Sequence, residues 1–232
     1  MSRKRGMAVR AALASGVLVG LFGIGTAGAQ SACADLGGIV GPDQSCHART
    51  VTSSYTLDFS FPVDYPDQQP LADYLIQTRD GFVDFAQLPP EQDRSYSLLV
   101  KSTTYQSGAP GSGTQSVVLR LSQDANPRPV AWYKAFNYDL GRQAPITLDT
   151  LFKPGTKPLD VVFPAVRREL EKRWQPEVLA SMLGPVDDGT FQNFALTDDA
   201  VIFFFGQGHL LGHPEGALTV SVPRTELASV LA

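Results

Sequence analysis

Apolar and polar residues alternate along several stretches of the chain, which is the pattern of β-strands with one buried face. The clearest example is YTLDFSF, where every second residue from Tyr55 to Phe61 is apolar. The same pattern, with Gly- and Pro-rich segments between its repeats, predicts a set of strands. In the first two thirds of the chain these strands cover residues 55–61, 96–105, 115–123 and 130–138. The segments SGAPGSG and DANPRP predict turns between them.

Helical spacing of apolar residues appears in three other segments. After Pro70, apolar residues recur three, four and seven positions apart as far as Ala86. The segment KPLDVVFPAVRRELEKRW shows the same spacing from Val162 to Trp174, and Pro164 within it predicts a kink or a late helix start. A short helix is expected for PEVLASML, ending at Gly184.

The C-terminal part returns to strands, over residues 191–196, 201–205 and 217–222. Asp198-Asp199 forms a turn between the first two, and the run VIFFF is typical of a fully buried strand. A helix beginning at Pro223 closes the chain. Because strands and helices do not alternate regularly, the predicted class is α+β, with antiparallel sheets and packed helices.

The first 29 residues have the composition of a secretory signal peptide. Basic residues are followed by an uncharged apolar run from Ala11 to Thr26, and Ala27-Gly28-Ala29 matches a cleavage site. The apolar run is shorter than the roughly 20 residues of a spanning helix, and no later stretch is apolar enough to span. We therefore expect a secreted protein without a transmembrane helix in its mature form, with retention at the cell wall as the alternative.

Charge limits the choice of partners. Of the 19 Lys and Arg residues, four precede residue 30, which leaves 15 against 23 Asp and Glu in the mature chain. This acidic balance disfavours nucleic acid and anionic lipid as partners. Both cysteines, Cys33 and Cys46, lie just after the cleavage site of a chain bound for an oxidising compartment, so we predict a disulfide between them.

Four long segments, in the same order, resemble a known family. They are FPVDYPDQQPLADYLIQTRDGF, WYKAFNYDLGRQAPITLDTLF, LDVVFPAVRREL and FQNFALTDDAVIFFF. They resemble the mycobacterial secreted immunogenic proteins, and among these the cell-wall-associated esterase branch. From about Pro145 onward the chain also resembles the extracellular domain of RsiV-type anti-sigma factors.

The resemblance implies a β-grasp-like C-terminal portion centred on the TDDAVIFFF hairpin. With the signal peptide at 1–29 taken from the sequence pattern, it divides the remaining chain into an N-terminal α+β subdomain at 30–144, which holds the predicted disulfide, and a C-terminal RsiV-like subdomain at 145–232. It also implies an esterase activity. Its implication for lysozyme recognition is weaker, because the Pro-Tyr-Glu segment of the sensor relatives is replaced here by Gly206-Gln207-Gly208-His209.

The residues themselves give only weak support for catalysis. An α/β-hydrolase would carry its nucleophile in G-x-S-x-G, and no serine of this chain has that setting. The remaining candidates are Ser107 in the glycine-rich turn as nucleophile, His209 as base and Asp199, or its neighbour Asp198, to orient the base. Ordinary hairpin turns are the preferred explanation for the serine and the aspartates.

Cofactor and metal motifs are not found. His209 and His213 are four residues apart, but the nearby Gly208, Gly212 and Pro214 disfavour a helix, and no glutamate completes H-E-x-x-H. His47 is expected at the surface. We therefore predict no cofactor and no metal.

Two functional hypotheses follow. The first is a secreted, cell-envelope-associated carboxylesterase acting on a small acyl ester. The second is a noncatalytic secreted binding domain whose ligand is a wall glycan, a host protein or a lysozyme-like enzyme.

Overall fold

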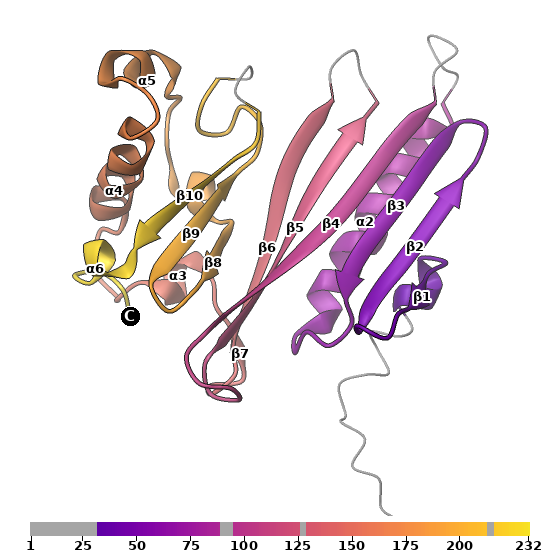
Figure 1. The fold of residues 1–232 in the computed structure, drawn as a ribbon, viewed down its shortest axis with the longest axis horizontal. Helices are drawn as coiled ribbons and strands as arrows, with labels where there is room; N and C mark the ends of the chain where they lie inside the picture. The colour runs from indigo at the N-terminus through magenta and orange to yellow at the C-terminus, as the bar shows by residue number, and fades with distance from the viewer. Residues whose placement is uncertain (1–31, 89–94, 126–128, 213–215) are drawn as a thin grey trace, which may run out of the picture.

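The computed structural model describes residues 32–88, 95–125, 129–212 and 216–232. They form two β-sheets with helices packed on them, which confirms the α+β class (Figure 1). The seven-stranded sheet comes from the first part of the chain and the three-stranded sheet from the last. Among the described residues, no helix has both the length and the apolar character needed to cross a membrane.

The seven-stranded sheet follows the order of the chain, from β1 to β7. Its strands are β1 (Ile39–Val40), β2 (Ser45–Val51), β3 (Tyr55–Pro62), β4 (Tyr96–Ser107), β5 (Thr114–Asp124), β6 (Val130–Asp139) and β7 (Ala144–Pro145). All neighbours are antiparallel except β3 and β4, which are parallel. Helix α2 (Gln68–Ala86) makes the crossover that a parallel pair needs.

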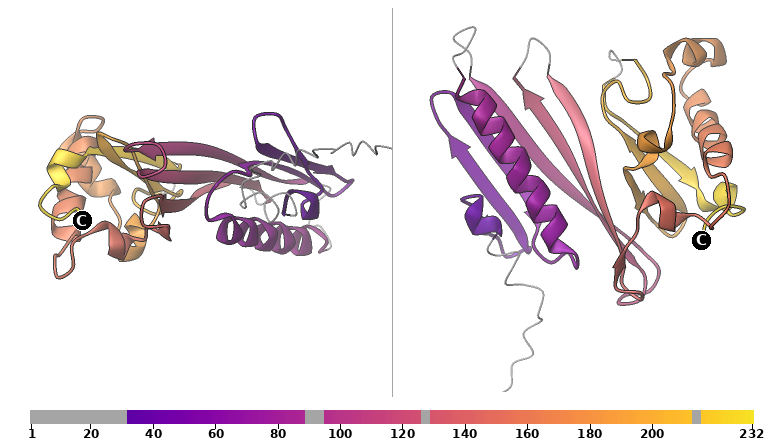
Figure 2. Two further views of the ribbon diagram at one scale, coloured as in Figure 1. Left: turned by 90° about the horizontal axis from the view of Figure 1, so that it is seen from below. Right: turned by 180° about the vertical axis from the view of Figure 1, so that it is seen from behind.

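Helix α2 lies along one face of this sheet (Figure 2). Its stripe of Leu71, Leu75 and Phe82 is buried against Phe59 and the other inward side chains of the strands. The sequence pattern predicted this helix and strands β3 to β6. It missed β2, because SCHARTV buries only the small residues Cys46 and Ala48 on its inner face, which gives a weak alternation signal.

Cys33 and Cys46 form the disulfide expected from the sequence. The bond ties the segment before β1 to β2, and both cysteines are buried. Gly38 passes so close that a β-carbon there would lie 2.7 Å from Sγ of Cys46. Only glycine fits that position without displacing the disulfide.

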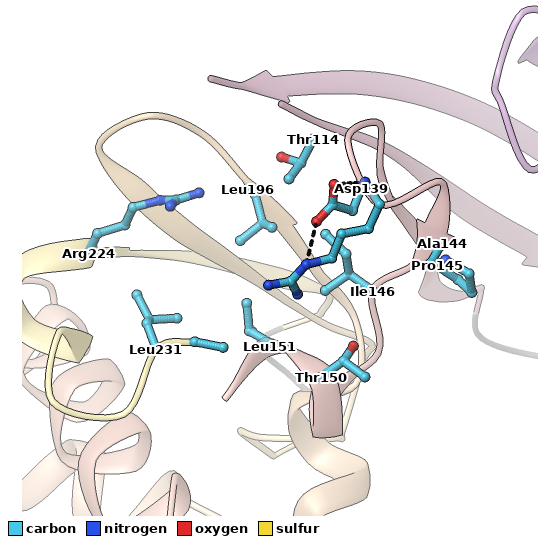
Figure 3. A pocket seen from close by; sticks show the side chains of 12 residues that line it. Thr114, Asp139, Ala144, Pro145, Ile146, Thr150, Leu151, Leu196, Arg224 and Leu231 are labelled. Atoms are coloured by element: carbon cyan, nitrogen blue, oxygen red, sulfur yellow. Dashed lines mark hydrogen bonds and ion pairs between the residues drawn. The ribbon is translucent and has the colours of Figure 1, made fainter. Parts of the chain in front are cut away.

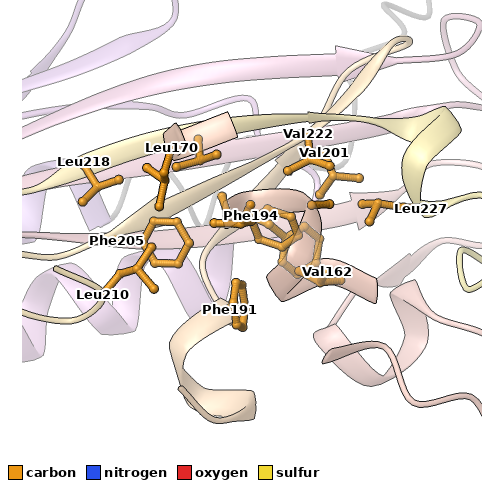
Figure 4. Packing of buried hydrophobic residues seen from close by; sticks show 14 of the residues in the cluster. Val162, Leu170, Phe191, Phe194, Val201, Phe205, Leu210, Leu218, Val222 and Leu227 are labelled. Carbon is orange, nitrogen blue, oxygen red and sulfur yellow. The ribbon is translucent and has the colours of Figure 1, made fainter. Parts of the chain in front are cut away.

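The second unit packs helices on the sheet β8 (Phe194–Leu196), β9 (Ala200–Phe205) and β10 (Leu218–Pro223), with β9 in the centre. The helical elements are α3 (Leu148–Leu151), α4 (Leu159–Glu171), α5 (Pro176–Met182), the 3-10 helix η1 (Asp188–Phe191) and α6 (Arg224–Leu227). Figure 4 shows the apolar core between α4 and the sheet, where Phe205 and Val162 are fully buried. This is the expected β-grasp-like portion. The division predicted between residues 144 and 145 falls inside β7 and stays a prediction.

Two local expectations for this unit were inaccurate. Pro164 does not delay helix α4, which begins at Leu159 and keeps the proline on an exposed position, whereas the alternative of a kink stays a prediction. The strand predicted over residues 191–196 is shorter. Asp187 accepts a hydrogen bond from the Thr190 N–H and holds the chain in η1 as far as Phe191, so the strand begins only at Phe194.

The two sheets pack on each other through the face of β4, β5 and β6 that points away from α2. Phe204 of β9 contacts Tyr105 and Tyr133, with ring centroids 5.9 and 5.2 Å apart. Polar bonds accompany these contacts. Leu196 N–H donates to Oγ of Ser116, and Nδ2 of Asn137 donates to the Phe194 carbonyl. The ring contacts and these hydrogen bonds fix one unit on the other, although the buried Oδ1 of Asn137 has no hydrogen-bond partner among the described residues.

Candidate functional site

The tip of the β4–β5 hairpin meets the second unit at one arginine. Nη2 of Arg224 donates to Oγ of Ser107 over 3.0 Å, and its Nε donates to the Thr197 carbonyl over 2.8 Å. Beside it, the Gly108 N–H donates to a carboxylate oxygen of Asp198 over 2.6 Å. The hairpin predicted as a surface turn is therefore held against the turn that precedes β9.

A pocket of about 310 Å³ opens next to this junction (Figure 3). That size lies at the low end of the roughly 300–1,000 Å³ typical of small-molecule sites. The lining residues come from both units: Thr114, Asp139, Arg142, Ala144, Pro145, Ile146, Thr150, Leu151, Leu196, Arg224, Leu231 and Ala232. In Figure 3, Arg224 and Asp139 enter from opposite sides, with Leu196 and Leu151 between them.

Asp139 has a charged partner within the pocket, whereas Arg224 has none among the described residues. Asp139 accepts a hydrogen bond of 2.8 Å from the Arg142 N–H and lies 3.7 Å from its Nε. Arg224 is partly buried and bonds only to neutral acceptors. Within the described parts of the chain, no carboxylate lies within 4.0 Å of its guanidinium, so its charge is uncompensated. The side chains of the pocket carry two positive charges and one negative charge, and Ala232 at the end of the chain adds its carboxylate.

The rest of the lining is largely apolar. Ile146, Leu151, Leu196 and Leu231 form an aliphatic wall. Thr114 is the cross-strand neighbour of both Ser107 and Asp139, and its buried hydroxyl has no hydrogen-bond partner in the described structure. The pocket thus combines a cation, a carboxylate and an aliphatic surface, which can bind a small molecule with one polar and one apolar part.

Of the residues predicted from the sequence as catalytic, Ser107 and Asp199 lie at this junction. The carbonyl of Asp199 accepts a hydrogen bond from the Arg224 N–H. His209 does not join them. Its turn is fixed to the opposite end of β6, where the Gln207 N–H donates to the Ala131 carbonyl.

The length of β6 sets the separation. Asp139, beside the pocket, and Ala131, beside the His209 turn, are eight residues apart in the strand, or roughly 26 Å at about 3.3 Å per residue. A serine–histidine pair needs hydrogen-bond contact. The structure therefore does not assemble Ser107, Asp199 and His209 into one constellation.

His47 does not supply a base to the pocket. His47 is exposed on β2, with its Nε2 4.0 Å from a carboxylate oxygen of Asp43. His213 lies outside the described residues. Within residues 32–88, 95–125, 129–212 and 216–232, no group of three His, Cys, Asp or Glu side chains is placed to hold a metal ion.

Sequence reasoning did not identify Asp139 and Arg224 as site residues. Asp139 lies in YDLGRQ, an ordinary turn composition, and Arg224 follows Pro223 at what reads as a helix start. Only the packing of the second sheet on the first brings positions 114, 139, 196 and 224 to one cavity. No local pattern could have revealed this.

Comparison with known proteins agrees with this architecture, and the broader of the two matches is to the DUF3298 family. Residues 149–225 match the family described as a protein of unknown function, DUF3298. Two solved DUF3298 proteins share the fold at 13% identity. The one from Bacteroides fragilis has a TM-score of 0.56 over 81% of this chain and 92% of its own. The one from Pseudomonas aeruginosa has a TM-score of 0.59 over 83% and 96%.

Comparison of whole sequences identifies a more specific group of mycobacterial relatives. The chain is 46% identical to Esterase Rv3036c of Mycobacterium tuberculosis over 94% of its length and 98% of that protein. It is 41% identical to immunogenic protein MPB64 of Mycobacterium bovis, and to MPT64 of M. tuberculosis, over 93% of its length and 95% of theirs. The chain belongs to this family of mycobacterial immunogenic and esterase proteins, which confirms the resemblance noted in the sequence.

Proposed function

We propose that the protein is a secreted, cell-envelope-associated carboxylesterase that hydrolyses short acyl esters in the pocket between Asp139 and Arg224. The observation that carries the proposal is the sequence similarity to a protein named as an esterase, which is 46% identical over 94% of this chain. The pocket adds a chemical basis for it. An uncompensated guanidinium faces an aliphatic wall, which suits an ester whose carbonyl oxygen becomes negative during hydrolysis.

The reaction in this proposal needs no histidine. A water molecule held by the Asp139 carboxylate attacks the carbonyl carbon and gives its proton to that carboxylate. The carbonyl oxygen becomes an oxyanion and is stabilised by the Arg224 guanidinium. When the bond to the alcohol oxygen breaks, the proton returns from Asp139 to the departing alkoxide. The products are the carboxylic acid and the alcohol.

Secretion forms part of the proposal and rests on the sequence. Arg3, Lys4 and Arg5, the apolar run and the Ala27-Gly28-Ala29 site are the parts of a signal peptide. The Cys33–Cys46 disulfide suits the oxidising compartment that export would reach. Cell fractionation tests it: the mature protein should be found in the culture medium or the cell wall, and a protein confined to the cytoplasm would contradict it.

A direct assay tests the activity. The purified chain from residue 30 onward should hydrolyse p-nitrophenyl butyrate with saturation kinetics, well above a heat-denatured sample of equal concentration. Longer acyl chains should react less well, because the cavity is about 310 Å³. A rate that rises linearly with substrate and survives denaturation would show nonspecific surface chemistry and would contradict the proposal.

One observation favours the alternative of a noncatalytic binding domain. Among the described residues, no serine or threonine hydroxyl is hydrogen-bonded to a histidine, so a conventional activated nucleophile is lacking. A saturable partner recovered from cell-wall extract or host serum by the inactive protein would support this alternative. Full esterase activity without any such partner would contradict it.

A further inference from the structure

Arg224 is held in place by groups that do not neutralise it. Its Nε and Nη2 donate to the Thr197 carbonyl and to the Ser107 hydroxyl, while its Nη1 has no partner among the described residues. Buried or partly buried charges are usually paired, because an unpaired one is costly to remove from water. The guanidinium is fixed in orientation and keeps one N–H₂ group for an anion.

The surroundings restrict what that anion can be. The wall of Leu151, Leu196 and Leu231 would exclude water from its ligand, which favours an aliphatic group. A fully hydrophilic anion such as phosphate would leave this wall uncovered. The preferred ligand therefore carries one anionic end and one short apolar tail.

Asp139, the one acidic side chain among the described lining residues, does not cancel this preference. Asp139 is 22% exposed and already bonded by the Arg142 N–H, with the Arg142 side chain beside it. That pairing offsets the negative charge of Asp139, and no carboxylate of the described residues lies within 4.0 Å of the Arg224 guanidinium. The Arg224 guanidinium thus remains available to a small anion.

We propose that this pocket is a binding site for short aliphatic carboxylates, with the carboxylate on Nη1 of Arg224 and the alkyl chain on the leucine wall. The inference builds on the proposed esterase, because such a carboxylate is the acid that ester hydrolysis releases. It adds that the product stays bound and competes with the substrate. Binding itself requires no turnover and is measured separately.

The test is a titration of the full mature chain with butyrate, followed by NMR. Butyrate should bind with a dissociation constant on the order of 1 mM, the range expected for a ligand of this size. Butyramide has the same shape without the charge and should bind at least about tenfold more weakly, since a charge-assisted hydrogen bond is lost. Because this comparison uses the unaltered protein, it does not depend on whether a variant folds.

Three variants locate the site. Arg224→Gln should weaken butyrate binding about tenfold or more, and Arg224→Lys should weaken it less because it keeps the charge. Arg120→Gln is the matched control. It removes an exposed arginine on β5 that does not line the pocket, and it should leave the affinity unchanged. Thermal unfolding of each variant confirms that it is folded.

The outcomes separate the two proposals. Equal binding of butyrate and butyramide, equal competition by inorganic phosphate, or an unchanged affinity in folded Arg224→Gln would each overturn the carboxylate site. Butyrate binding without any ester hydrolysis would uphold the site and contradict the esterase. Hydrolysis without butyrate binding or product inhibition would uphold the esterase and overturn the site.

Discussion

Nη2 of Arg224 donates a 3.0 Å hydrogen bond to Oγ of Ser107, which lies 117 residues earlier in the chain. This bond joins the tip of a hairpin in the first sheet to the start of the last helix. It also fixes the guanidinium at the edge of the pocket. Ser107 is therefore interpreted as a residue that positions Arg224, and not as a nucleophile.

Replacing Ser107 by alanine tests that interpretation. Ser107→Ala should lower the free energy of unfolding by about 1–3 kcal/mol, because a partly buried charged donor loses its acceptor. Hydrolysis of p-nitrophenyl butyrate should fall only severalfold. Urea unfolding and initial rates measure the two effects. A folded Ser107→Ala protein that loses at least about a thousandfold in rate would identify Ser107 as the nucleophile instead.

His209 is expected to take no part in ester hydrolysis. It lies at the far end of β6 from the pocket, so His209→Ala should change kcat/KM for the same ester by less than about twofold, since acid–base catalysis acts only within hydrogen-bond reach. The rate is measured across pH 5 to 9, where an imidazole would add its own titration (about pH 6.5 for an ordinary histidine). Loss of a limb of that profile in His209→Ala would show that this histidine takes part after all.

The disulfide is expected to contribute to stability and not to chemistry. Removing it in a Cys33→Ala, Cys46→Ala protein should cost about 3 kcal/mol, the value for closing a loop of this length. Chemical denaturation measures the loss. Treating the unaltered protein with a reductant should reproduce it, and the double variant should not respond to the reductant. A loss below about 1 kcal/mol would mean that the surrounding core, including buried Leu36, holds this segment without the bond.

The burial of Tyr65 leads us to expect that the free energy of unfolding decreases at alkaline pH. Burial raises the pKa of its hydroxyl above the usual value of 10.0, and the charges of Asp67 and Tyr138 add to the shift. The folded state therefore holds this proton more tightly than the unfolded state does. Its stabilising contribution is complete below about pH 10 and is lost as the pH rises beyond that.

Tyr65→Phe removes this contribution. No hydrogen bond of the Tyr65 hydroxyl is found among the described residues, and the ring would keep its edge contacts with Phe136 and Tyr138. Stability at pH 7 should change by less than about 1 kcal/mol, a typical size for a conservative change. Unfolding midpoints between pH 9 and 11 should then fall less steeply than in the unaltered protein. An identical slope in both proteins would contradict the assignment to Tyr65.

Sequence patterns predicted most of the elements because each depends on its own residues. The alternation in β3 and the stripe on α2 both report which face is buried. The weakly alternating β2 and the short β8 depend on their neighbours, so they were missed or misplaced at their ends. The sequence also predicted the disulfide, since only two cysteines were present.

The pocket could not be predicted in the same way. Asp139 ends β6 and Arg224 begins α6, and their approach depends on aromatic packing between Phe204, Tyr105 and Tyr133. Ser107 and Asp199 are candidates because they lie in turns, and both are close to the pocket. His209 is a candidate only because the chain has few histidines, and it lies elsewhere. Sequence spacing gives no distance between residues in separate strands.

The most direct test of the account is the rate of p-nitrophenyl butyrate hydrolysis by Asp139→Asn, compared with Arg120→Gln as a matched surface change. Asparagine keeps the shape of the side chain and removes its ability to take a proton. If Asp139 is the general base, Asp139→Asn should lower kcat by about a hundredfold or more, the usual contribution of such a base, while Arg120→Gln should leave it unchanged. A folded Asp139→Asn protein with full activity would contradict this role.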